Sequence, residues 1–170
     1  MKTNSVLCFA VTAERERRFT VSPAVVREAL EKEYIKISDI IAIEQVWIIN
    51  DEKCSGRIRK ARDLLLKEDL VLHERYEHTV KYHIDKTLDY EVTTDISEND
   101  YNLLKKLYKE IKPQCKNRVY VVDPSGKYEN YIITIDYPDD KPEECWVEFE
   151  LKDGRISKEF KKPEWLVEKN

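Results

Sequence analysis

Residues Glu14–Arg18 form an uninterrupted run of charged side chains, and this run restricts the kind of strand that the chain can build there. Successive side chains of a β-strand point to opposite faces, so Glu14, Glu16 and Arg18 share one face. Two carboxylates and a guanidinium in one row do not suit an apolar core. They suit the wall of a site that holds a divalent cation and a phosphate together. We therefore expect this strand to line a charged site to which later strands add further acids and bases.

Composition limits the classes of protein to which the chain can belong. Of its 170 residues 38% are charged, yet the net charge is only −4. Such near-cancellation argues against a general nucleic-acid binder, which needs a clear basic excess. No apolar run reaches the length of a membrane span, and Met1–Ser5 lacks the pattern of a signal peptide. We expect a cytoplasmic protein with a single domain over residues 1–170.

The cysteines and histidines give no sign of a disulfide framework or a zinc site. The four cysteines (Cys8, Cys54, Cys115 and Cys145) are scattered and form no CxxC pair. The three histidines do not complete a zinc-binding spacing. Free thiols are therefore expected.

Period-two alternation predicts about eight strands, and two stretches have helical periodicity. The strands are expected at 5–21, 40–49, 57–62, 77–83, 88–96, 117–122, 131–137 and 146–151. Ser22 and Pro23 predict the start of one helix, and Ser97 predicts a second helix that runs through Glu110. We treat 67–72 as a linker or insertion. Because no strand–helix–strand rhythm is present, we expect an α+β, mostly β fold: an eight-stranded antiparallel closed barrel with flanking helices.

Charged residues recur inside these predicted strands. A single such residue is usually on a solvated outer face, where an ion pair contributes about 0–1 kcal/mol. The recurrence favours a different reading, because the neighbours of these charges are apolar; Val147 and Phe149, for example, flank Glu148. Apolar residues likewise flank Asp136 and Lys81 in the sequence. If the apolar faces pack against helices, the charged faces must point into the barrel.

A barrel lined with ions indicates the kind of ligand that it binds. An uncompensated buried charge costs several kcal/mol, so we expect a bound ligand to neutralise the lining. Carboxylates select Mg²⁺ or Mn²⁺, and arginine forks match phosphate oxygens. A polyphosphate or nucleoside triphosphate with its metal would compensate both signs of charge.

The motifs also occur in an order that resembles the CYTH superfamily, the triphosphate tunnel metalloenzymes. Glu14–Arg18 is similar to the ExExK signature of that family, with Arg18 in place of the final Lys. The later motifs, in order, are Arg57-Ile58-Arg59 (RxR), Thr79-Val80-Lys81 (T-I-K), Glu91-Val92-Thr93 (ExE), Lys116-Asn117-Arg118 (KxR), Ile135-Asp136 (I-D), Glu148-Phe149-Glu150 (ExE) and Pro163-Glu164-Trp165-Leu166 (P-x-W-L). The resemblance covers nearly the whole chain, and the order of the motifs makes it specific.

The resemblance implies a triphosphate bound along a barrel axis and hydrolysed with the help of Mg²⁺ or Mn²⁺. It implies metal ligands at Glu14, Glu16, Asp136, Glu148 and Glu150. Phosphate-binding residues would be Arg18, Arg57, Arg59, Lys81, Lys116 and Arg118. Catalytic residues would be Glu14, Glu16, Glu150 and Arg59. The function expected is a metal-dependent triphosphatase acting on tripolyphosphate, thiamine triphosphate or a nucleoside triphosphate. The alternatives are an adenylate cyclase and a non-catalytic triphosphate- or nucleotide-binding module.

The expected partner is a small-molecule triphosphate. Neither a membrane nor nucleic acid is expected, apart from a 5′-triphosphate end, and the chain would be a monomer or a homodimer. The sequence departs from the family pattern at Thr93, where a second Glu is usual, at Asp89, where an Arg is common, and at Val167, where a Gly is usual. We read Trp47 as a packing residue. His83 is read as a surface or satisfied histidine, with a general base as the alternative.

Overall fold

The computed structural model describes residues 10–65, 73–85, 88–151 and 160–168. Eight strands and two helices lie within these ranges. Their bounds are β1 (Ala10–Val21), α1 (Pro23–Glu31), β2 (Lys36–Asn50), β3 (Cys54–Asp63), β4 (Glu74–His83), β5 (Leu88–Asp95), α2 (Glu98–Leu107), β6 (Gln114–Val122), β7 (Tyr131–Pro138) and β8 (Cys145–Leu151). The predicted linker at 67–72 lies outside the described residues, as does the part of the predicted first strand before Ala10.

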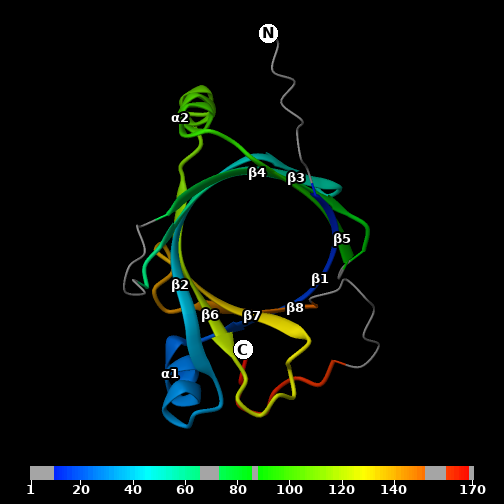
Figure 1. The fold of residues 1–170 in the computed structure, drawn as a ribbon, viewed down its shortest axis with the longest axis vertical. Helices are drawn as coiled ribbons and strands as arrows, with labels where there is room; N and C mark the ends of the chain where they lie inside the picture. Colours follow the sequence, from blue (N-terminus) through cyan, green and yellow to red (C-terminus); the bar gives the residue numbers. More distant parts are fainter. Residues whose placement is uncertain (1–9, 66–72, 86–87, 152–159, 169–170) are drawn as a thin grey trace.

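The strands form one antiparallel sheet that curls into a closed ring (Figure 1). The order around the ring is β1-β5-β4-β3-β2-β6-β7-β8. β1 closes it by pairing with two neighbours: residues 10–15 pair with β5, and residues 16–21 pair with β8. The mostly β architecture with antiparallel pairing and flanking helices, predicted from the alternation, is confirmed.

α1 covers the outer face of one side of the barrel. Ser22 and Pro23 begin this helix, as the sequence predicted, and it buries Val26 and Ala29. These side chains join a core cluster with apolar residues of β6, β7 and β8, among them Val147 and Ile135. Because the apolar side chains of β7 and β8 point outward into this cluster, the alternate residues of the same strands must point inward.

α2 covers a second part of the outer face. Its Tyr101 is buried together with Val46 of β2 and Ile58 of β3. The side chain of Ser97 accepts a hydrogen bond from the backbone of Asp100, which is the predicted N-cap. The helix ends at Leu107, three residues before the predicted end at Glu110, although the pattern of its apolar stripe continues.

One part of the outer face of β4 and β5 is not covered by a helix. Tyr82 and Tyr90, which lie opposite one another on these strands, are 51% and 45% exposed. Tyr76, nearer the start of β4, does pack against Tyr101 of α2. The argument that Lys81 points inward because its apolar neighbours pack against a helix therefore fails only at the Tyr82 end of the strand. Lys81 nevertheless lines the interior, because the alternation of the strand places it there.

Two expectations from composition concern thiols and membrane spans. Cys54, Cys115 and Cys145 are free thiols, and Cys8 lies outside the described residues. Neither described helix is long and apolar enough to cross a membrane.

One end of the barrel interior is apolar. Ile41, Ile43 and Ala61 are each 3% exposed and form a cluster that Tyr120 packs against. Ile41 and Ile43 alternate with the outward residues of β2 and so share the inner face with Gln45. None of these four apolar residues lines the charged cavity described below, so that cavity ends where this cluster begins.

Candidate active site

A cavity of about 500 Å³ occupies the charged part of the barrel interior. All strands except β7 contribute side chains to its wall. The lining comprises Glu16, Arg18, Gln45, Trp47, Asn50, Ser55, Arg57, Arg59, Lys81, His83, Asp89, Glu91, Gln114, Lys116, Arg118, Trp146, Glu148 and Glu150. The structure thus gathers nearly all of the site residues proposed from the sequence around one space, whatever their individual roles.

The lining, as the described residues give it, leaves two of the residues proposed from the sequence to be placed. Asp136 lies beneath the wall and is fully buried. The backbone of Glu14 pairs with Asp89 in the β1–β5 register, but its side chain lies outside the described part of the structure. The roles of Asp136 and Glu14 as metal ligands therefore stay predictions.

A tightly paired wall is built around Asp136. The β6–β7 register places Arg118 opposite Asp136, and the guanidinium donates from Nε to Oδ1 at 2.6 Å and from Nη2 to Oδ2 at 2.7 Å. Lys116 donates to Oδ2 as well. Burial alone would raise the pKa of Asp136, but the hydrogen bonds and charges of Arg118 and Lys116 outweigh it and hold that pKa below its usual range. Both oxygens of the Asp136 carboxylate are therefore already engaged by cations.

Glu148 continues this network toward β1. It accepts from Arg118 Nη2 at 2.8 Å and from Arg18 Nε at 2.7 Å. Burial opposes the charge of Glu148, but the attraction of Arg118 and Arg18 lowers its pKa. On this side of the cavity, acids and bases neutralise one another directly, so the expectation that only a bound ligand could compensate the lining is wrong here.

Lys116 is the weakest cation of the tightly paired wall. Its side chain is 8% exposed, and its pKa is lowered to about 8 by burial and then by the nearby charge of Arg118. The carboxylate of Asp136 opposes this shift without cancelling it. Lys116 is thus close to its titration range at neutral pH.

A loosely paired wall lies opposite, on β3, β4 and β5. Its ion pairs are longer: Arg57–Glu91 at 3.9 Å, Lys81–Glu91 at 3.1 Å and Arg59–Glu77 at 3.6 Å. The side chain of Arg59 is only 12% exposed. Its Nε and Nη2 atoms are buried and have no hydrogen-bond partner among the described residues. A buried guanidinium with unused donors is suited to an anionic ligand.

Electrostatics at Arg59 support the same conclusion. Burial and then the like charges of Arg57 and Arg118 lower its pKa to about 10. Glu77 and Glu91 offset only part of this effect. Arg59 remains charged at neutral pH, in surroundings that hold more positive charge than nearby acids compensate.

Glu16 and Glu150 are the residues that best fit a divalent cation. They lie opposite one another in the β1–β8 register, and both line the cavity. Within the described ranges, no group of three or more His, Cys, Asp or Glu side chains forms a metal site. Mg²⁺ does not require one, because it is commonly bound by one or two carboxylates together with substrate phosphates and water. The donor set therefore fits a cation that is shared with a phosphate ligand.

Two of the departures from the family pattern, Asp89 and Thr93, make side-chain contacts within the loosely paired wall. Asp89 lies opposite His83 in the register, and its Oδ1 is 2.9 Å from His83 Nδ1. Thr93 donates from its hydroxyl to Glu91 Oε1 at 2.8 Å and lies 3.2 Å from the hydroxyl of Thr79. Thr93 thus orients the carboxylate that faces Lys81 and Arg57.

The sequence reading missed an uncharged group in the lining, formed by Gln45, Gln114 and Trp47. Trp47 was read as packing, yet its indole N–H donates to Gln114 Oε1 at 3.0 Å, and both residues line the cavity. Gln45 is 4% exposed and donates to the same oxygen at 3.3 Å. A glutamine on the inward face of β2, after two isoleucines at alternate positions, is the signal that could have indicated this group.

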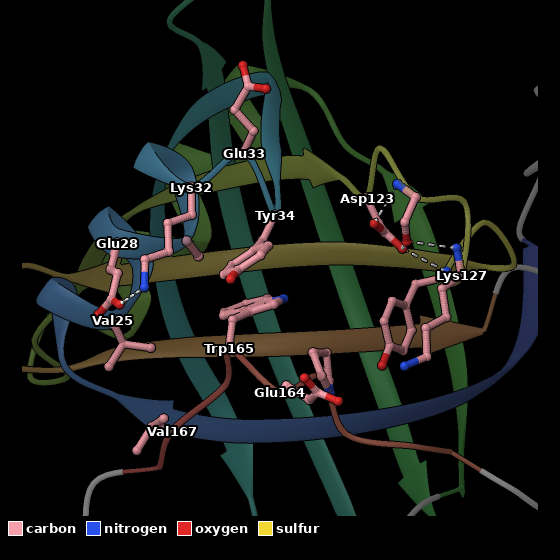
Figure 2. Close-up of a pocket in the computed structure, with 14 residues that line it drawn as sticks. Val25, Glu28, Lys32, Glu33, Tyr34, Asp123, Lys127, Glu164, Trp165 and Val167 are labelled. Carbon is pink, nitrogen blue, oxygen red and sulfur yellow. Dashed lines mark hydrogen bonds and ion pairs between the residues drawn. The ribbon is translucent and has the colours of Figure 1, made fainter.

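A second hollow of about 500 Å³ lies outside the barrel, between α1, the loop from β6 to β7 and residues 163–167 (Figure 2). Figure 2 shows Tyr34 and Trp165 pointing toward one another across it. Lys32 is paired with Glu28 at 2.5 Å, and Glu33 and Glu164 add further acid to the lining. This lining does not suit a polyphosphate, which leaves the barrel cavity as the candidate site.

Comparison with known proteins identifies solved structures with a similar fold. No family model matches the chain, and no curated protein sequence matches it. A conserved hypothetical protein from Pyrococcus furiosus is similar at 17% identity, covering 85% of this chain and 80% of that one, with a TM-score of 0.59. PH1012 protein from Pyrococcus horikoshii is similar at 20% identity, covering 85% and 79%, with a TM-score of 0.57. The inorganic triphosphatase NE1496 is also found, at 17% identity over 91% and 84%, but its TM-score of 0.46 is too low to support an argument.

Proposed function

We propose that this chain, whose barrel and motif order resemble those of the CYTH superfamily, binds a triphosphate in the barrel cavity and hydrolyses it with a divalent cation. The observation that carries the proposal is Arg59, a buried guanidinium with two nitrogens unbonded among the described residues, which faces the same cavity as the carboxylates Glu16 and Glu150. Unused donors on one wall and a carboxylate pair in the same cavity suit a phosphate chain that carries its own metal ion.

Each wall has a distinct part in the proposed reaction. Arg57, Arg59 and Lys81 bind phosphate oxygens. Arg57 and Arg59 thereby exchange long contacts with Glu91 and Glu77 for shorter ones with the ligand. Arg118 is held by Asp136 and Glu148, so it presents a fixed cation that needs no reorganisation as charge develops on the phosphoryl oxygens.

Glu16 and Glu150 would hold Mg²⁺ or Mn²⁺. When bound, the ion would neutralise charge on phosphate oxygens and lower the pKa of a coordinated water. A carboxylate of this pair positions the attacking water and accepts its proton. The water oxygen forms a bond to the terminal phosphorus, and the bond to the bridging oxygen breaks, leaving its electron pair on the departing diphosphate.

The proposal is tested by incubating the protein with tripolyphosphate and increasing Mg²⁺ or Mn²⁺ and measuring released phosphate. We expect metal-dependent release in the wild type and no metal-dependent turnover in Glu16→Gln, which keeps the shape of the side chain and removes its charge. Asn102→Leu, on α2 and outside the cavity lining, is the control. Wild-type turnover by Glu16→Gln would show that Glu16 is not part of the site. In a parallel incubation with ATP, formation of cyclic AMP and diphosphate would indicate a cyclase instead.

A further inference from the structure

The uncharged part of the cavity contains a hydrogen-bond acceptor whose orientation is fixed by its neighbours. The indole N–H of Trp47 can only donate, so the atom of Gln114 that it contacts at 3.0 Å must be the carbonyl oxygen. Gln45 contacts this same oxygen at 3.3 Å and must therefore present its NH₂ group to it. Because the NH₂ group of Gln45 makes this contact, its amide oxygen Oε1 is not used in it.

Gln45 Oε1 has no partner within the described parts of the chain, although it is buried. The residue is 4% exposed and lines the cavity. A buried acceptor without a donor is costly, by about 1–3 kcal/mol, and such atoms are rare in native proteins. A ligand with an N–H or O–H donor would supply the hydrogen bond that this oxygen lacks.

A phosphate group does not meet that requirement. Its oxygens are acceptors at neutral pH, so they would be repelled by Gln45 Oε1 and by Gln114 Oε1, which already accepts twice. An organic group attached to the phosphates would supply such a donor. The cavity volume of about 500 Å³ is within the range of roughly 300–1,000 Å³ typical of pockets that enclose whole small molecules.

The register places this acceptor beside the phosphate-binding cations. Gln45 lies opposite Arg59, and Trp47 lies opposite Arg57, in the β2–β3 pair. Side chains directly opposite in an antiparallel pair have Cβ atoms about 4.5–5.5 Å apart. Trp47, two residues along the same face from Gln45, adds a flat aromatic surface, with the guanidinium carbon of Arg57 5.4 Å from its ring centre.

We infer that the substrate is a nucleoside triphosphate whose base donates an N–H to Gln45 Oε1, with its phosphates on Arg57 and Arg59. This inference rests on the proposed function and narrows the substrate from triphosphates in general to those that carry a nitrogenous base. Inorganic tripolyphosphate would use the cations alone and leave the Gln45 acceptor unpaired.

The test compares ATP with purine riboside 5′-triphosphate, which lacks only the amino group and has no N–H donor on its base. Affinities are measured by calorimetry in EDTA, with tripolyphosphate as the reference ligand. We expect ATP to bind about tenfold more tightly than the purine analogue, as one hydrogen bond to a buried acceptor predicts. The difference should vanish in Gln45→Leu and persist in the matched amide control Asn102→Leu.

The outcomes separate this inference from the proposed function. Equal affinity of the wild type for ATP and the analogue, with tripolyphosphate bound, overturns the base-binding role and leaves the triphosphate site standing. Failure to bind any of the three compounds, in EDTA and again with Mg²⁺ present, overturns both. Because the two nucleotides are compared on the wild type, the result does not depend on whether Gln45→Leu folds.

Discussion

The two walls of the cavity carry the same types of side chain but use them differently. In the tightly paired wall, Asp136 and Glu148 hold Arg118 at 2.6–2.8 Å. In the loosely paired wall, the ion pairs of Arg57 and Arg59 measure 3.9 and 3.6 Å. Charges that neutralise each other hold the barrel together, and charges left partly uncompensated are available to a ligand.

Burial explains why the two arrangements differ in cost. Asp136 is 0% exposed, so its charge can persist only with cations at hydrogen-bond distance. The carboxylates of the loosely paired wall are partly exposed, Glu91 at 13% and Glu77 at 22%. Water reaches Glu77, so its longer contact with Arg59 is tolerated. Oε2 of Glu91 is buried, and Lys81 compensates it at 3.1 Å.

The largest effect is expected from breaking the tightly paired wall. Asp136→Asn would leave Lys116 and Arg118 as buried cations without their shared carboxylate, and we expect a loss of about 3–5 kcal/mol in the free energy of unfolding. Urea denaturation followed by tryptophan fluorescence measures it. A loss below that caused by Glu77→Gln, the corresponding change in the loosely paired wall, would contradict the comparison.

Arg59→Ala is expected to impair function rather than stability. Removing one preorganised donor commonly costs about 100- to 1,000-fold in rate, and we expect a loss of this size in kcat/KM for triphosphate hydrolysis. The melting temperature should not fall as it does for Asp136→Asn, because the mutation removes a buried cation with unused donors. Arg59→Lys serves as the matched control, since it retains the charge without the fork.

The titration of Lys116 should appear in the pH dependence of triphosphate affinity. Its pKa of about 8 means that it is charged below this value and neutral above it, so its contribution to binding an anion is lost as pH rises. We expect affinity to fall by about tenfold through this range, with proton uptake on binding near pH 8. Calorimetry in buffers of different ionisation enthalpy measures the uptake. The same step in Lys116→Met would assign it to another group.

The smallest expected effect comes from the loosely paired wall itself. Glu77→Gln removes an ion pair that is too long for a hydrogen bond, so the free energy of unfolding should change by less than about 1 kcal/mol. Arg59 is then released to the ligand, and tripolyphosphate should bind about two- to fivefold more tightly. Weaker binding would show that Glu77 orients Arg59 rather than competing for it.

The sequence predicted which strands exist and which face of most of them points inward, because alternation records both. Phe149 and Ile135 indicated the outward face, and Glu148 and Asp136 then had to be internal. The pairing of Asp136 with Arg118 could not be predicted, because it depends on the β6–β7 register, which charge patterns alone do not specify.

The residues that the sequence missed are those without a charge signal. Gln45 stands between Glu44 and Val46, and nothing in its immediate neighbours marks it as internal. Its role in the cavity depends on Gln114 and Trp47, which contact one another only when β6 and β2 pair. The sequence predicted that Lys81 faces inward, but for a reason that does not hold at this position: Tyr82, beside it, is exposed rather than covered by a helix.

The division of β1 between two neighbours has a mechanical consequence for this barrel. The change-over falls between Arg15, the last residue paired with β5, and Glu16, the first paired with β8. The point at which β1 changes its pairing partner is thus next to the Glu16–Glu150 pair. An ion held by Glu16 and Glu150 would add a link between β1 and β8 beside this change-over, so the resistance of the ring to opening would depend on whether the cavity is occupied.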